Sequence, residues 1–226
     1  MSALSIEQIE QNPGLPQWVG GMMEIGTGLG YVKQLKKEGP YTYPYIHLTD
    51  DDELKAIRLR KLFGGTKTGS KTKGSYEWKL TGERTAKLVI PALSYAPSRA
   101  HMISSIEEWF TSDKDTRQII AEGMRAADRT PVKPKDYASL VNMPEFVAGV
   151  IDGRGIFHWD FPWGGLRLTI HSKNVALLTA LSEKFDVTVL DGISEITGGV
   201  FHKIEIQRNQ TLGEILDMTR DFRMLN

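Results

Sequence analysis

Hydrophobic and polar residues follow one another in blocks whose periods predict helices and strands in a fixed order. In the first half the predicted order is a helix, two strands, a helix, a polar loop, a strand and a helix, over residues 15–25, 29–37, 43–49, 50–63, 66–75, 76–82 and 83–93. Asp50, Asp51 and Asp52 suit the start of the middle helix, and Gly64 with Gly65 suits its end.

The second half follows the same plan. Its helix, two strands, helix, two strands and helix are expected over residues 142–153, 156–160, 166–171, 173–185, 187–190, 200–207 and 211–222. We therefore predict an α+β fold of two αββαββα repeats, comprising residues 1–110 and 142–226. Residues 111–141 are charged and predict a linker with a helix near Arg117–Ala127.

Both repeats open on a helix that contains glycine among apolar residues. The stretches are WVGGMMEIGTG at residues 18–28 and FVAGVIDGRG at residues 146–155. A glycine inside a helix costs about 1 kcal/mol relative to alanine. Its presence in both stretches indicates that another part of the chain comes very close to each helix.

Composition adds limits. The 226 residues contain no cysteine, so disulfides and cysteine-based zinc sites are excluded. There is no apolar run of about 20 residues, and the polar start MSALSIEQIEQ does not suit a signal peptide. We expect an intracellular protein of the cytoplasm, nucleoid or an organelle matrix, without a membrane partner. The net charge is zero, whereas dedicated nucleic-acid binders are usually basic.

The repeated order and the two glycine motifs resemble the LAGLIDADG homing endonucleases in their single-chain, two-repeat form. The resemblance covers residues 15–110 and 142–224. It implies that the repeats are related by a pseudo-twofold axis and that two antiparallel sheets form a saddle for duplex DNA. It also implies a monomer whose motif helices touch through small residues, here Gly20, Gly21, Ala148 and Gly149.

The resemblance places the metal-binding acids of such nucleases at the eighth position of each motif. Those positions hold Gly26 and Arg154, neither of which can bind a metal. Glu24 and Asp152 occupy the sixth positions; they are the candidate catalytic residues, although acids there more often support the helix end. Arg154 could instead grip a phosphate or pair with either acid. We expect no cofactor, or magnesium if the chain is active.

Basic residues are concentrated in the first repeat between Lys55 and Lys79. The loop lysines could reach phosphates, or they could simply form a solvated hairpin that discourages aggregation. His47 and His171 occupy matching positions on opposite wings, which argues against a shared zinc site. The residues expected to contact nucleic acid are Lys33, His47, Lys67, Lys71, Lys73, Lys79, Arg154, Arg167, His171 and Lys203.

Strand alternation predicts which side chains lie under the helices and which face the saddle. The first group is Ile46, Leu48, Trp78, Leu80, Leu166, Leu168, Ile170, Ile204 and Ile206. The second is His47, Thr49, Glu77, Lys79, Arg167, Thr169, His171, Lys203 and Glu205.

Three functions remain open from the sequence. The first is a nucleic-acid-binding protein that has lost cleavage, acting on double-stranded DNA or structured intron RNA as a maturase-like or regulatory binder. The second is a metal-dependent DNA endonuclease that uses displaced acids. The third is a scaffold with a protein partner in a protein or ribonucleoprotein assembly. The missing motif acids count against the second function, and the zero net charge favours the third.

Overall fold

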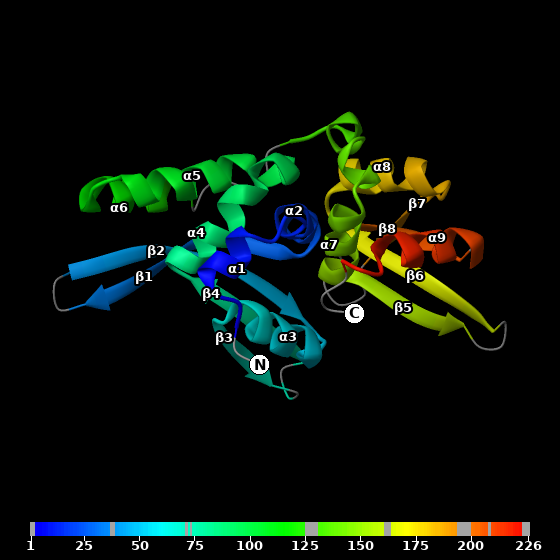
Figure 1. Cartoon of the computed structure of the whole chain (residues 1–226), viewed down its shortest axis with the longest axis horizontal. Helices are drawn as coiled ribbons and strands as arrows, with labels where there is room; N and C mark the ends of the chain where they lie inside the picture. Colours follow the sequence, from blue (N-terminus) through cyan, green and yellow to red (C-terminus); the bar gives the residue numbers. More distant parts are fainter. Residues whose placement is uncertain are drawn as a thin grey trace.

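The computed structural model describes residues 3–36, 39–70, 72, 74–124, 131–160, 164–193, 200–207 and 209–222. Two halves lie on either side of a central pair of helices (Figure 1). The first half contains α1 (Ile6–Glu10), α2 (Leu15–Ile25), β1 (Thr27–Lys36), β2 (Gly39–Asp50), α3 (Glu53–Phe63), β3 (Thr66–Ser70), β4 (Ser75–Thr81), α4 (Glu83–Val89), α5 (Ala100–Thr111) and α6 (Lys114–Met124). The second contains α7 (Pro144–Arg154), β5 (Gly155–Asp160), β6 (Gly165–Ser172), α8 (Val175–Phe185), β7 (Val189–Ile193), β8 (Val200–Ile206) and α9 (Asn209–Thr219).

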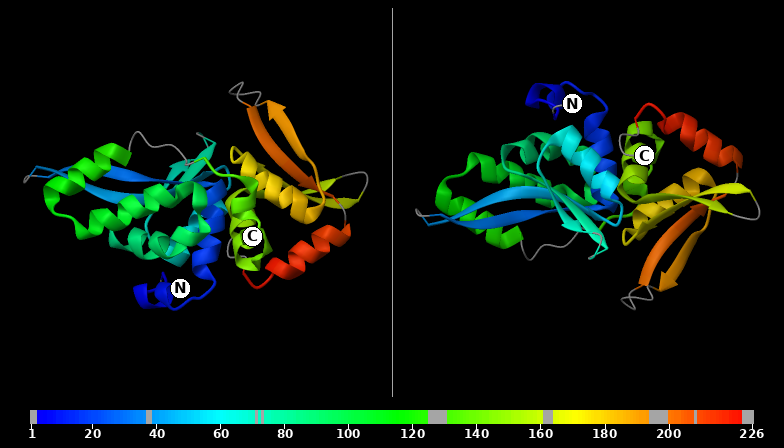
Figure 2. Two further views of the ribbon diagram at one scale, coloured as in Figure 1. Left: turned by 90° about the horizontal axis from the view of Figure 1, so that it is seen from above. Right: turned by 90° about the horizontal axis from the view of Figure 1, so that it is seen from below.

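Each half forms one antiparallel sheet of four strands with the same topology. The strand orders are β1-β2-β4-β3 and β5-β6-β8-β7. This confirms the α+β class and the two-sheet plan predicted from the sequence. Figure 2 shows α2 and α7 crossing the middle of the molecule, with one sheet extending to each side.

The helices cover one face of each sheet, and alternate strand residues are buried there as predicted. Ile46, Leu48 and Trp78 are buried in the first core, and Leu168, Ile170 and Ile204 in the second. Leu166 is only half-buried but packs against the second core. The period-two pattern therefore identified the covered face of both sheets correctly.

Three parts of the first half differ from the sequence prediction. Residues 66–70, expected in a polar loop, form β3 because they complete the ladder along β4. The helix expected at 83–93 ends at Val89 and continues as a 3₁₀ helix, Ile90–Tyr95, where Pro91 cannot donate a helical hydrogen bond. Helix α5 was not predicted at all.

The expected linker at 111–141 also contains packed structure. Helix α6 begins at Lys114, and its Ala121 and Met124 are buried in the first core. This part of the linker therefore belongs with the first repeat. Two short 3₁₀ turns, Pro134–Tyr137 and Leu140–Asn142, lead into α7, and Tyr137 is buried in the second core.

The backbones of α2 and α7 touch at two glycines. A Cβ atom on Gly21 would stand 2.1 Å from the carbonyl oxygen of Phe146, and one on Gly149 would stand 1.9 Å from that of Trp18. Any side chain at either position would force the helices apart. Ala148 is buried in the first core, across the helix contact from its own repeat.

Gly20 does not belong to this contact, which corrects the sequence prediction. A Cβ there would meet the backbone and Cβ of Tyr95, in the 3₁₀ segment after α4. The residue that sequence reasoning missed is Gly153, whose Cβ would stand 2.7 Å from Cγ2 of Ile25. In the described part of the chain, no helix is both long and apolar enough to span a membrane.

Replacing Gly149 with alanine should destabilise the fold by about 3 kcal/mol, because the added methyl would press on a backbone carbonyl that cannot rotate away. The control is Gly213→Ala in α9, where a Cβ meets nothing within 4 Å. That change should be neutral or stabilise by up to about 1 kcal/mol. Urea unfolding measures both free energies, and equal stabilities would rule out the close helix contact.

Candidate nucleic-acid interface

The face of each sheet opposite the helices is here called the open face. In the first sheet it carries Tyr45, His47, Thr49, Thr66, Thr68, Glu77 and Lys79. In the second it carries Ile156, His158, Arg167, Thr169, His171, Leu190, Lys203 and Glu205. All the residues predicted to face the saddle lie on these faces, although Thr169 is buried.

On the first open face the charged groups contact one another. The Nδ1 atom of His47 lies 3.0 Å from Glu77, and the Lys79 ammonium lies 3.9 Å from the ring centre of Tyr45. Gly28 and Gly30 on β1 leave room for the rings of His47 and Tyr45, since a Cβ at either glycine would collide with them. The first open face is therefore nearly neutral, with the rings of Tyr45 and His47 beside the single lysine Lys79.

The second open face is arranged around Glu205. Its carboxylate lies 2.6 Å from the Lys203 ammonium and 3.7 Å from the Arg167 guanidinium. The hydrogen bond from Lys203, strengthened by the two positive charges, outweighs burial and lowers the pKa of Glu205. The single carboxylate of Glu205 is thus paired with two cations, so these three groups together carry a net positive charge.

Two predicted contact residues do not lie on the open faces. Lys67 pairs with buried Trp78 across the ladder, and its ammonium forms an ion pair with Glu53 of α3, so it lies on the helix side. Lys33 is exposed but lies on the same face of β1 as Leu29 and Tyr31, which are buried against the first core. Lys71 and Lys73 lie outside the described residues.

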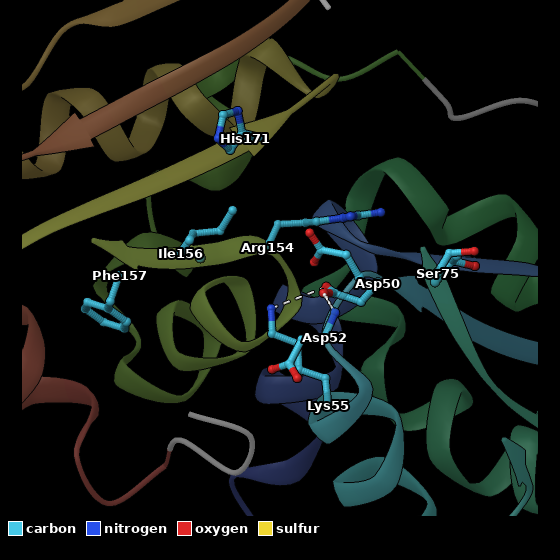
Figure 3. A pocket seen from close by; sticks show the side chains of 11 residues that line it. Asp50, Asp52, Lys55, Ser75, Arg154, Ile156, Phe157 and His171 are labelled. Carbon is cyan, nitrogen blue, oxygen red and sulfur yellow. Dashed lines mark hydrogen bonds and ion pairs between the residues drawn. The ribbon is translucent and has the colours of Figure 1, made fainter. Parts of the chain in front are cut away.

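Arg154 lies where the two halves meet, at the end of α7. It borders a pocket of about 690 Å³ that is also lined by Asp50, Asp51, Lys55 and His171. Figure 3 shows Arg154 extending across this pocket toward the first repeat, where Asp50 lies. The described residues give the Arg154 side chain no hydrogen bond or ion pair, and its charge helps to lower the pKa of Asp50.

Asp50 is held by groups of its own repeat. It forms a buried ion pair with Lys55 at 3.4 Å and accepts a hydrogen bond from the backbone N–H of Asp52 at 2.9 Å. Burial raises the pKa of Asp50, but the Asp52 hydrogen bond and the Lys55 charge outweigh it, and the pKa is lowered. The pKa of Asp51 is raised, mainly by its hydrogen bond with Asp50.

Gly26, at the end of α2, has little space for a side chain. A Cβ there would stand 2.9 Å from the carbonyl oxygen of Gly153 and 3.3 Å from Cγ of Arg154. Gly153 and Arg154 of the second motif therefore occupy the space that an acidic side chain at position 26 would need.

Glu24 is fully buried and accepts hydrogen bonds from three separate segments. The donors are the backbone N–H and hydroxyl of Ser98 at 2.8 and 2.6 Å, the hydroxyl of Tyr137 at 2.6 Å and the amide of Asn174 at 2.7 Å. Burial and the Glu24 charge raise the pKa of Tyr137, which keeps its hydroxyl protonated as a donor. This carboxylate ties α2 to the linker and to the start of α8.

Asp152 is buried as well, and it accepts a hydrogen bond of 2.9 Å from the indole Nε1 of Trp18. Each sixth-position acid therefore binds a group of the opposite half or of the linker. Neither carboxylate lines the pocket at Arg154. Their contacts suit a role in holding the repeats together.

Several solved structures with this arrangement are of nucleases bound to DNA. The chain superimposes on meganuclease I-SmaMI bound to uncleaveable DNA with a TM-score of 0.58 at 12% identity, over 93% of this chain and 85% of that one. It also matches the LAGLIDADG homing endonucleases I-GzeII, in complex with its DNA target, and I-LtrWI, bound to target DNA, both at 0.54 and 12%. Those alignments span 92% and 98% of this chain and 84% and 86% of theirs.

The chain has the LAGLIDADG homing-endonuclease fold. At the level of sequence, no family model and no curated protein matches it. The likeness in structure covers both repeats and the linker between them.

A divalent metal, which this fold implies for cleavage, does not fit the residues present. Gly26 has no side chain that could bind a metal, and the guanidinium of Arg154 repels a cation. The carboxylates of Glu24 and Asp152 already accept hydrogen bonds from neighbouring donors. Within the described ranges no group of three or more histidines and acids is arranged to hold a metal ion.

Sequence reasoning missed the partners of Glu24. Ser98, Tyr137 and Asn174 lie 74, 113 and 150 positions away along the chain. Only Asn174 gives a local signal, because it precedes an apolar helix and caps it through the N–H of Leu177.

Replacing Glu24 with glutamine should destabilise the fold by about 2 kcal/mol. The amide nitrogen cannot accept, so it would face one of the donors that now bind Glu24. Glu183→Gln on the exposed face of α8 serves as the control, with a change of less than about 0.5 kcal/mol. If chemical denaturation gives the same stability for both variants, the buried carboxylate does not hold the repeats together.

Proposed function

We propose that this chain binds double-stranded nucleic acid across the open faces of its two sheets and does not cleave it. The observation that carries the proposal is the pair Gly26 and Arg154 at the end of the motif helices, inside a fold whose solved relatives are bound to DNA. Such a protein would act as a maturase-like or regulatory binder.

The open faces supply groups that suit contact with a nucleic-acid backbone. Lys79 lies on the first face, Arg167 and Lys203 on the second, and Arg154 between them. Phosphate contacts of this kind set affinity and register without reading sequence. His158 and His171 add donors on the second face.

The acids on these faces limit the affinity. Glu77 lies beside His47, and Glu205 beside Arg167 and Lys203, so phosphates must compete with carboxylates for the same cations. Together with the zero net charge, this supports moderate binding that weakens steeply with salt.

The absence of cutting follows from the end groups of α2 and α7. In-line attack on a phosphodiester needs a group that activates water and neutralises the leaving oxygen. Arg154 can neutralise charge on a phosphate, but a guanidinium does not deprotonate water.

The test uses a random-sequence pool of duplex DNA and a structured RNA, each with EDTA, magnesium or manganese. Binding should be independent of the metal and should leave the duplex intact. The affinity should fall with salt with a logarithmic slope of about −2.7 to −3.6 for three or four phosphate contacts. Magnesium-dependent cutting that Glu24→Gln abolishes would establish the displaced-acid endonuclease instead. Complete absence of binding at low salt would favour the scaffold.

Glu205→Gln should strengthen duplex binding several-fold, because it releases Arg167 and Lys203 for phosphates. Glu183→Gln removes the same charge from the outer face of α8 and should change the affinity less than twofold. Fluorescence anisotropy at two salt concentrations measures both. An equal effect of the two variants would mean that only net charge matters and that the open face of the second sheet is not the contact surface.

A further inference from the structure

Two pockets at the junction are pseudo-symmetric counterparts. One, here the Asp50 pocket, is the 690 Å³ pocket at Arg154, and it joins the turn after β2 to the end of α7. The other, here the Lys173 pocket, has a volume of about 410 Å³ and joins the turn after β6 to the end of α2. Its lining includes Gly26, Gly28, Arg99, Arg154, His171 and Lys173.

The register of the two repeats pairs the residues of these pockets. Asp52 caps α3 through the N–H of Leu54, and Asn174 caps α8 through that of Leu177. Because both caps follow the second strand of a sheet, the triplet Asp50-Asp51-Asp52 corresponds to Ser172-Lys173-Asn174. The same turn carries three acids in one repeat and one base in the other.

The pockets therefore differ in charge. The Asp50 pocket combines three aspartates with Lys55 and Arg154. The Lys173 pocket is bordered by Arg99, Arg154, His171 and Lys173 and by no acid. Four nitrogen-bearing side chains around one cavity form an anion site, whereas the aspartates repel a phosphate.

We propose that the Lys173 pocket binds one phosphate group and the Asp50 pocket binds none, so that a nucleic acid is held at the junction through one strand only. This inference rests on the proposed function, which supplies the phosphate from the backbone of the bound duplex. A free phosphate monoester or inorganic phosphate offers the same chemistry.

The side chains that line the Lys173 pocket suit the binding of a phosphate group. Arg99 is fixed by a hydrogen bond of 2.9 Å from its guanidinium to the carbonyl oxygen of Thr27, so its charge stays at the pocket wall. Lys173 is exposed and can move to meet a ligand. Gly26 and Gly28 line the same pocket and add no charge to it.

His171 reports an anion at the junction, and the Lys173→Gln variant assigns that signal to the Lys173 pocket, because His171 lines both pockets. Burial, followed by the Lys203 charge, lowers the pKa of His171, with Arg154 and His158 adding to this effect and Glu205 opposing it. An anion in the Lys173 pocket would stabilise the imidazolium form of His171 and raise its pKa.

The first arm of the test titrates sulfate into the free protein, since sulfate keeps its charge between pH 5 and 8. NMR of the His171 ring should show its pKa rising by about 0.5 unit or more at saturation. Lys173→Gln should weaken the sulfate response several-fold, whereas Lys61→Gln, on the exposed side of α3, should leave it unchanged. An unchanged His171 titration at high sulfate would overturn the inference.

The second arm uses duplex DNA. Lys173→Gln should weaken binding and reduce the salt slope by about 0.9, the loss of one phosphate contact. Asp51→Lys places a base at the equivalent position of the Asp50 pocket and should increase the slope by a similar amount. Lys61→Gln again serves as the control and should alter neither affinity nor slope.

The two arms separate the inference from the proposed function. If the duplex binds but Lys173→Gln has no effect and sulfate does not shift His171, the pocket is wrong and the proposed function stands. If sulfate shifts His171 but no nucleic acid binds, the proposed function fails and the pocket stands as a site for free phosphate.

Discussion

The close approach of α2 and α7 determines the rest of the molecule. Gly21 and Gly149 leave no space for a Cβ between the two backbones, so the helices can meet in only one register. Each helix begins a repeat and leads directly into the first strand of its sheet. The contact therefore sets how the two sheets stand relative to each other, and with that the surface which both present to a partner.

Around this contact, the acids of both motif helices accept hydrogen bonds from other segments of the chain. Glu24 binds the linker and the start of α8, and Asp152 binds Trp18 of the other repeat. Buried carboxylates that accept several hydrogen bonds are costly to disrupt, because their donors would be left without partners. These bonds link the two repeats at the junction, where the motif helices end in Gly26 and Arg154.

The sequence predicted those features that depend on local pattern. Alternation identified the covered faces of both sheets, and the two glycine motifs identified the central helices, because both signals lie within a few residues. It failed for β3, since Thr66–Ser70 contains no apolar residue and is a strand only through pairing with β4. The same error placed Lys67 in a loop that could reach phosphates, whereas it lies on the helix side of the sheet and pairs with Glu53. Gly20 was misassigned because its neighbour, Tyr95, lies in an unpredicted 3₁₀ segment.

The proposed binding mode requires that nucleic acid lies on the open faces of the sheets rather than on the helices. A photoreactive benzophenone amino acid placed at Thr68 or Leu190 would test it, with Lys61 and Glu183 as positions on the helical side. Irradiation with a bound duplex should give cross-links from Thr68 and Leu190 and none from Lys61 and Glu183. Cross-links from the helical positions, or from none of the four when the duplex is bound, would contradict the account.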